Sequence, residues 1–177
     1  GATPNAAQYK QLLCEAYKRI RQADPTAVVI SAGLAPTGRV DGPNGNDGDK
    51  QDERKYLAAL IDAGGGACLD AVGYHPYGFS ADYDVEPDEA SNDPTRNCAN
   101  GFCFRGVERL YYDIMVPKHL GDKKVWATEF GWITRPPNHC FTDPNWQAEW
   151  ADRAWQIVTD DKQAYNLVGA YQYADAH

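Results

Sequence analysis

Apolar residues recur every three or four positions between Thr3 and Asp24, and this period predicts a helix with one apolar face. Thr3 is the expected N-cap, Pro4 suits the first turn, and Asp24-Pro25 ends the helix. The first element is therefore expected to be an amphipathic helix. Its predicted apolar face consists of Tyr9, Leu12, Leu13, Ala16, Tyr17 and Ile20.

Four short runs of apolar, often β-branched residues predict strands that are buried on both faces. Three further helices are expected between these runs, at about 52–63, about 106–119 and from Asp143-Pro144 onwards. Strict alternation of strands and helices is typical of a parallel α/β sheet with right-handed crossovers. The predicted strands span residues 28–32, 69–74, 124–128 and 167–172.

The longest polar segments, 33–50 and 78–105, both follow predicted strands. This asymmetry predicts function at the carboxyl ends of the strands, as in a TIM barrel. A doubly wound sheet alternates in the same way, but its first strand normally leads into a glycine-rich turn, and residues 32–36 contain one glycine. A (β/α)8 barrel needs about 250 residues and eight strands. We therefore expect residues 1–177 to form one partial domain, either half a barrel or a half-sheet that another chain completes.

Composition narrows the possible functions. A formal net charge of −8 argues against nucleic-acid binding, which depends on Lys and Arg to neutralise phosphates. No apolar run approaches the roughly 20 residues of a membrane span. The chain is rich in aromatics, with five Trp and eleven Tyr, whose flat faces and polar tips suit both cores and sugar-binding clefts.

Five cysteines bear on the compartment of the protein. Cys98 and Cys103 are spaced to close a small disulfide ring in a loop rich in Asn and Gly, although free thiols are the alternative. A disulfide would imply an oxidising compartment, so an extracellular or secreted location is expected. Cys14 and Cys68 are expected to be small buried residues. No metal or other cofactor is expected, because no Cys-x-x-Cys pair occurs and the acidic loop 41–49 lacks the spacing of an EF-hand.

One carboxylate stands out at a predicted strand end. The apolar run 125–128 leads to Glu129, and two aromatics with a glycine follow at once. A carboxylate on the face where loops gather can attack an anomeric carbon as a nucleophile. A solvated strand-end Glu is the alternative, but the flanking aromatics argue against it. The expected sugar-binding aromatics are Trp126, Trp132, Tyr171 and Tyr173, and core or rim packing is the alternative for the last two.

His75 and Tyr77 end the preceding predicted strand. Alternate residues of a strand point the same way, so both can reach a carboxylate on the neighbouring strand. A Tyr77 hydroxyl that donates to Glu129 would hold the carboxylate ionised and oriented, whereas a buried structural role is the alternative for His75. Asp70 lies roughly 13 Å back along its strand and is expected to be structural. The carboxylates in predicted helices are expected on solvated faces: Glu15, Glu53, Glu108 and Glu149.

Together these residues resemble the large clan of retaining glycoside hydrolases that are built on the TIM barrel, of the cellulase and xylosidase type. The two most specific matches are Tyr74-His75-Pro76-Tyr77-Gly78 and Thr128-Glu129-Phe130-Gly131-Trp132. Generic matches run from Pro4 to Tyr9, through Leu12-Leu13 and Asp24-Pro25, to residues 32–37. The resemblance thus extends through the whole chain.

The resemblance implies parallel (β/α) units that form strands five to eight, the second half of the barrel. Glu129 matches the nucleophile after the seventh strand, and His75 and Tyr77 match a His-x-Tyr after the sixth. The acid/base Glu of this clan belongs to an Asn-Glu-Pro motif on the fourth strand, and no such motif occurs here. The clan also tends to have a Trp after the eighth strand, where this chain has Gln172-Tyr173.

The leading hypothesis is hydrolysis of β-glycosidic bonds in oligo- or polysaccharides by a retaining double displacement. The expected partners are a carbohydrate and either the missing half of the barrel or a second chain. The chain alone is expected to be inactive. The alternative is a non-catalytic carbohydrate-binding or structural module derived from such an enzyme.

Overall fold

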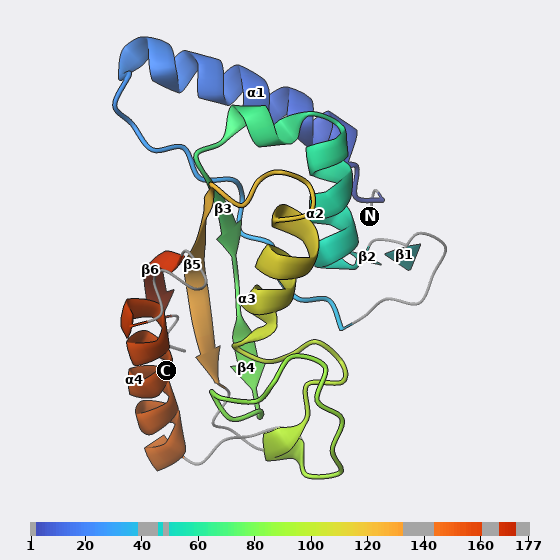
Figure 1. Ribbon diagram of the computed structural model, residues 1–177, viewed down its shortest axis with the longest axis vertical. Coiled ribbons are helices and arrows are strands. Elements are labelled where there is room, and N and C mark those ends of the chain that lie inside the picture. The colour runs from blue at the N-terminus through green and yellow to red at the C-terminus, as the bar shows by residue number, and fades with distance from the viewer. Residues whose placement is uncertain (1–2, 39–45, 48–49, 133–143, 161–166, 173–177) are drawn as a thin grey trace.

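The computed structural model describes residues 3–38, 46–47, 50–132, 144–160 and 167–172. A parallel sheet lies at its centre, with β3 (Ala71–Tyr74), β4 (Tyr77–Phe79), β5 (Lys124–Trp132) and β6 (Leu167–Gln172). β3 and β4 follow one another along one edge of β5, and β6 pairs with the other edge (Figure 1). All these pairings are parallel, so the predicted α/β architecture is confirmed.

The first predicted strand, 28–32, forms two isolated parallel bridges to β3 instead of a regular ladder: Ile30 to Ala71 and Leu34 to Tyr74. Between the bridges, the Ser31 hydroxyl accepts a hydrogen bond from the Gly73 N–H at 3.0 Å. A side chain therefore takes the place of a backbone carbonyl and interrupts the ladder. The sequence predicts the position and direction of this segment correctly, but not its interruption.

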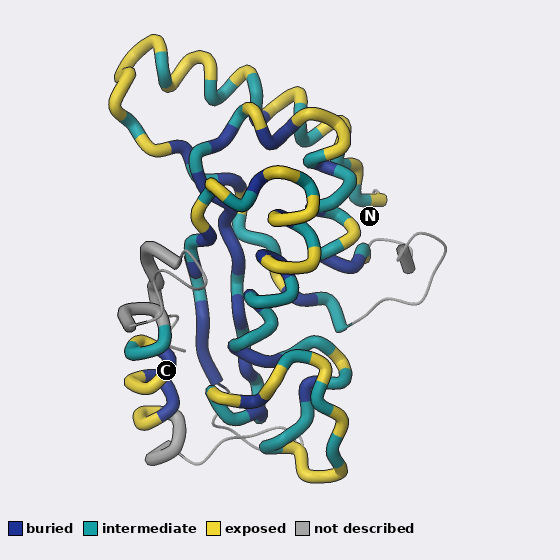
Figure 2. Tube along the Cα trace, viewed as in Figure 1, coloured by how far each residue is buried: buried dark blue, intermediate teal, exposed yellow. Residues whose placement is uncertain are grey.

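Helix α1 (Ala6–Ala23) begins later than expected. Its N-cap is Asn5, whose side chain accepts from the Gln8 N–H at 2.9 Å, so the prediction of Thr3 as cap is wrong. The helix also uses less of its predicted apolar face, because Leu12 is 67% exposed while Leu13 is buried. Figure 2 shows how much of α1 remains exposed beside the buried strands β3 and β5.

The other helices cover one face of the sheet. Helix α2 (Glu53–Asp62) is capped by Asp52, which accepts from the N–H groups of Arg54 and Lys55. Helix α3 (Gly106–Glu108) continues as a π-helical segment, η4 (Arg109–Met115), where an ordinary α-helix is expected. Helix α4 (Pro144–Asp160) packs beside β6 (Figure 1). The short elements are β1 (Asn46–Asp47), β2 (Lys50–Gln51), η2 (Gly65–Cys68) and η3 (Pro94–Arg96).

Two disulfides tie these elements together. Cys98 and Cys103 are bonded, which confirms the predicted ring. Cys14 and Cys68 are also bonded and join α1 to η2. Both are only partly buried, so their prediction as small buried residues is wrong. The spacing of 54 residues gave no local signal for this pair. Both disulfides are consistent with an oxidising compartment.

The main core lies between the sheet and the helices. It combines residues from β3 and β5 with residues from α2 and η4, and no described helix is long and apolar enough to cross a membrane. The largest fully buried side chains are Tyr74, Phe104, Leu57, Leu60, Leu69, Leu110, Met115, Val72, Val85 and Val125.

Candidate active site

The position of Glu129 depends on an extra residue in β5. On the β6 side, Ala127 pairs with Ala170 and Phe130 pairs with Gln172. The chain thus advances three residues along β5 while it advances two along β6. On the β3 and β4 side, β5 again carries one residue more than its neighbours over the same stretch. Both neighbours therefore indicate a β-bulge that contains Thr128 and Glu129.

The bulge moves Glu129 away from the helix-covered face. In a regular strand, side chains alternate, and Glu129 would share the face of Val125, which is fully buried in the core. Instead Phe130 and Trp132 join Val125 in the core cluster, and the Glu129 side chain is 43% exposed. Glu129 thus lies within β5, not beyond its end as expected, yet it faces outward.

Tyr77 and His75 both approach the same oxygen of Glu129. The Tyr77 hydroxyl donates to Oε2 at 2.5 Å, and His75 Nδ1 lies 3.7 Å from Oε2. The two rings meet edge to face, with centroids 6.2 Å apart. The structure therefore brings together the three predicted catalytic residues. Within the described residues, both of these contacts are to Oε2.

Gly33 makes room for this group. A Cβ atom at Gly33 would lie 1.9 Å from His75 Nε2 and 2.7 Å from Thr128 Oγ1. The backbone of the 28–34 segment is thus in contact with the imidazole, and any larger residue at position 33 would displace it. The glycine fixes the imidazole from the side opposite the carboxylate, a constraint that the sequence alone did not reveal.

A row of aromatic rings leads away from Glu129. Tyr77 is followed by Phe79 at a centroid distance of 6.1 Å, and Phe79 by Phe102 at 4.6 Å. Phe79 and Phe102 are both partly exposed. Sequence reasoning missed these two residues, because Phe102 reaches Phe79 from the middle of a long loop.

The four aromatic residues that are predicted to bind sugar differ in burial and in position. Trp132 is 4% exposed, and its indole N–H donates to the Ala81 carbonyl at 2.7 Å, so it is a core residue and does not present a face to a ligand. Trp126 is partly buried and follows the core residue Val125, so it lies on the face of Glu129, nearer the start of β5. Tyr171 belongs to β6, with its backbone alone described, and Tyr173 lies outside the described residues.

The predictions for two other carboxylates, Asp70 and Glu53, have different outcomes. Asp70 accepts from the Val29 N–H and from Arg21, as expected for a structural residue. Glu53 is 8% exposed, so the prediction of a solvated face is wrong for it. Burial raises the pKa of Glu53, and the neighbouring Asp52 adds to the shift. Glu53 lines a pocket of about 330 Å³ between α1, α2 and residues 32–37, next to Gly33.

No group of His, Cys, Asp and Glu in the described part of the chain is arranged to hold a metal ion. The acidic loop 41–49 lies largely outside the described residues, apart from 46–47. The local chemistry is therefore that of an exposed carboxylate, a hydroxyl, an imidazole and aromatic rings.

Comparison with solved structures shows which known fold this chain resembles. The chain is similar to a family 39 glycoside hydrolase from the gut symbiont Bacteroides cellulosilyticus WH2, with a TM-score of 0.59 and 21% identity. The match covers 98% of this chain and 32% of that chain. The chain partly matches the TIM-barrel fold of glycoside hydrolases.

Two further structures support the same fold. An α-L-arabinofuranosidase from Thermotoga maritima, solved with arabinose, matches 96% of this chain and 30% of its own, at a TM-score of 0.58 and 14% identity. A GH128 (subgroup II) endo-β-1,3-glucanase from Sorangium cellulosum matches 97% of this chain and 53% of its own, at a TM-score of 0.54 and 18% identity. The chain thus spans about a third to a half of these proteins. No family model and no curated protein matches the sequence.

Proposed function

We propose that this chain is part of the catalytic domain of a retaining β-glycoside hydrolase, with Glu129 as the nucleophile. The observation that carries the proposal is the pairing of an outward-facing carboxylate with the Tyr77 hydroxyl at 2.5 Å, in a fold shared with glycoside hydrolases. A phenol that donates to a carboxylate stabilises its ionised form, which is the form that attacks.

The proposed chemistry is a double displacement. Glu129 Oε1 attacks the anomeric carbon, and the bond from that carbon to the leaving oxygen breaks with its electron pair on the oxygen. A general acid, which we assign to no described residue, gives that oxygen a proton. A water oxygen then bonds to the anomeric carbon, and the bond from that carbon to Glu129 Oε1 breaks with its electron pair on Oε1. The same group, now a base, accepts one proton of the water. Tyr77 and His75 hold Oε2 while Oε1 reacts.

Within the described residues, the 28–34 segment is bridged to β3 on one side and to no strand on the other. Leu12, Ile20 and Val28 are 67%, 39% and 61% exposed, and they lie on α1 and at the start of this segment. Apolar surface and a strand edge that no described residue pairs with favour further strands beside residues 28–34. We propose that the rest of a barrel covers this edge. The mass of the natural protein in solution tests the alternative, in which a second copy of the chain pairs there.

Replacement of the nucleophile tests the function. In the natural protein at its full length, Glu129→Gln removes the attacking charge and keeps the shape, and we expect kcat on a cleaved glycoside to fall at least about a thousandfold. Glu15→Gln, an exposed carboxylate on α1, is the matched control and should retain activity. Activity of Glu129→Gln close to that of the control would overturn the assignment. Sugar binding without any cleavage by the natural protein would favour the non-catalytic module.

A further inference from the structure

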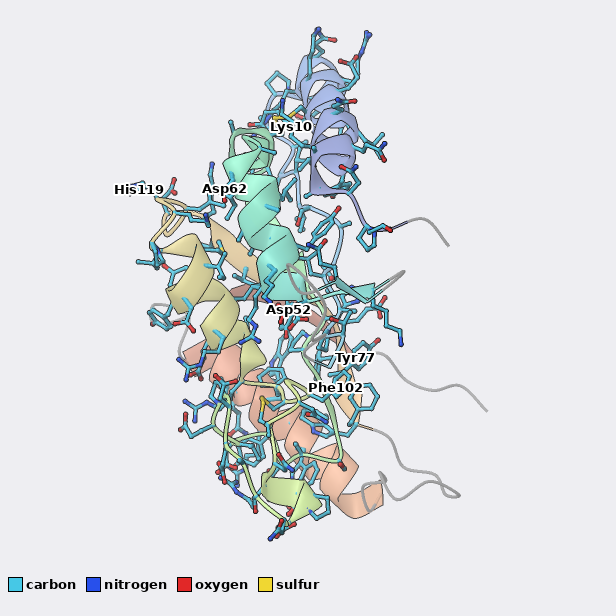
Figure 3. All side chains as sticks on the ribbon, turned by 90° about the vertical axis from the view of Figure 1, so that its right-hand side faces the viewer. Lys10, Asp52, Asp62, Tyr77, Phe102 and His119 are labelled. Carbon is cyan, nitrogen blue, oxygen red and sulfur yellow. A yellow bond between two sulfur atoms is a disulfide. The ribbon has the colours of Figure 1, made fainter. Side chains whose placement is uncertain are left out.

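The row of rings that begins at Tyr77 continues beyond the residues assigned to catalysis. Phe79 lies 6.1 Å from Tyr77 and 4.6 Å from Phe102, between centroids. In Figure 3, Tyr77 and Phe102 are labelled close together, below Asp52, the N-cap of α2. Because Tyr77 contacts Glu129 directly, a ligand bound at Glu129 that extends along this row would meet Phe79 and Phe102 next.

Phe102 is presented by a closed ring. The Cys98–Cys103 disulfide encloses Phe102 together with Ala99, Asn100 and Gly101, and both cysteines belong to a small buried core. Within the ring, the Gly101 N–H donates to the Cys98 carbonyl at 2.8 Å, and the Phe102 N–H donates to the Asn100 side chain at 3.0 Å. This arrangement limits the freedom of Phe102 before any ligand binds, which lowers the entropy cost of binding.

A second loop holds the ring of Phe102 from another side. Gly38 has φ of +77°, and a Cβ atom there would lie 3.1 Å from Phe102 Cε2. The Phe102 ring is therefore packed against the backbone of the loop that follows the 28–34 segment. Loops from two different strand ends meet at this side chain, as they do in sites at the carboxyl edge of parallel sheets.

Phe79 adopts a backbone conformation that disfavours side chains, with φ of +52°. Such strain persists where the surrounding structure enforces it, and it is concentrated at binding sites. Here the strained backbone places the Phe79 ring between Tyr77 and Phe102. The result is partly exposed, rigid aromatic surface contiguous with the catalytic group.

We infer that Phe79 and Phe102 form the binding position for a second, neutral sugar ring, next to the ring that reacts at Glu129. The inference rests on the proposed function and adds that the substrate is an oligosaccharide. Sugar rings carry an apolar C–H face that packs on flat aromatic surface, and neither phenylalanine contributes a charge. An apolar aglycone is the competing occupant, and the test below separates it from a sugar.

The test compares two substrates in the natural protein at its full length. One is a 4-nitrophenyl monoglycoside, with the sugar chosen from glucose, xylose and arabinose by activity, and the other is the trisaccharide of that sugar. Phe102→Ala is expected to lower kcat/KM for the trisaccharide about tenfold more than for the monoglycoside, because it removes one stacking partner. Phe102→Trp should restore the ratio. Tyr112→Ala, which removes an exposed aromatic from η4, is the control and should leave the ratio unchanged.

The other outcomes are also informative. An equal loss on both substrates would overturn the inference, because Phe102 would then act only through the shape of the Glu129 site. A larger loss on the nitrophenyl substrate would also overturn it and assign the position to an apolar leaving group. If the unmodified protein cleaves neither substrate and binds neither, the proposed function fails, whereas unchanged ratios in an active enzyme defeat the second sugar position alone.

Discussion

The two ends of the sheet use carboxylates in opposite ways. Asp70, just before β3, gives one oxygen to the Val29 N–H and the other to Arg21, both at 2.7 Å, and its side chain is 22% exposed. Glu129, near the end of β5, has one hydrogen bond to Tyr77 and is 43% exposed. At the first end both carboxylate oxygens accept hydrogen bonds from within the protein. At the second, the contacts given by Tyr77 and His75 are both to Oε2.

The two disulfides also differ between the two ends of the sheet. Cys14–Cys68 joins α1 to η2 at the end where Asp70 lies, across 54 residues. Cys98–Cys103 closes a ring of adjacent residues that presents Phe102 at the other end. If the proposed function holds, mutations at the first end should affect stability and mutations at the second should affect activity.

The largest expected effect on stability comes from the long disulfide. Replacing both Cys14 and Cys68 by Ser should lower the free energy of unfolding by about 4 kcal/mol, since closing a long loop restricts the unfolded chain most. The same change at Cys98 and Cys103 should cost about 2 kcal/mol. Denaturant unfolding of both double variants measures the two values. Equal losses would break the comparison, because the second ring would then be as important to the fold as the first.

The next effect is expected at Asp70. Burial raises its pKa, but the Val29 N–H, Arg21 and Tyr17 outweigh burial and hold the pKa below its ordinary value. Asp70→Asn should therefore cost about 2 kcal/mol of unfolding free energy at pH 7, through lost charge-assisted hydrogen bonds.

The pH dependence of this loss has a defined sign. Because the folded pKa is lowered, the contribution of Asp70 is complete above about pH 4 and is lost as the pH falls through the folded pKa. The stabilities of the wild type and Asp70→Asn should converge in acid. A difference that stays constant from pH 7 to pH 3 would show that the ionised carboxylate is not the source of the stability.

The smallest effect is expected from a substitution at the end of the sheet where Glu129 lies. Tyr77→Phe removes one hydroxyl and should reduce kcat/KM of the natural protein roughly tenfold, with little change in unfolding free energy, because the ring contacts remain. Denaturant unfolding of the same variant provides the second measurement. A large loss of stability with an unchanged kcat/KM would make Tyr77 a structural residue.

Much of the fold could be predicted because its signals are local. The apolar runs predict the positions of β3, β5 and β6, and the two short motifs predict that His75, Tyr77 and Glu129 meet. Sequence reasoning is therefore most successful where neighbouring residues determine the outcome.

The missed features depend on distant residues. The Ser31 hydroxyl interrupts the first strand through Gly73, and Cys14 finds Cys68, without any periodic pattern that would indicate either contact. The sequence predicts Trp132 as a sugar-binding residue beside Glu129. The bulge, however, reverses the alternation of side chains along β5 and buries Trp132. In each case a tertiary contact or a single extra residue overrides the local pattern.

The bulge in β5 has a consequence for how this protein can change over generations. Thr128 and Glu129 form the stretch where β5 exceeds its neighbours by one residue, and Ala127 and Phe130 on either side are buried. Exchange of the side chain at position 129 thus leaves the packing on both sides intact. Deletion of one residue there would shift every later side chain of the strand to the wrong face. Natural variants should therefore keep the length of this stretch fixed.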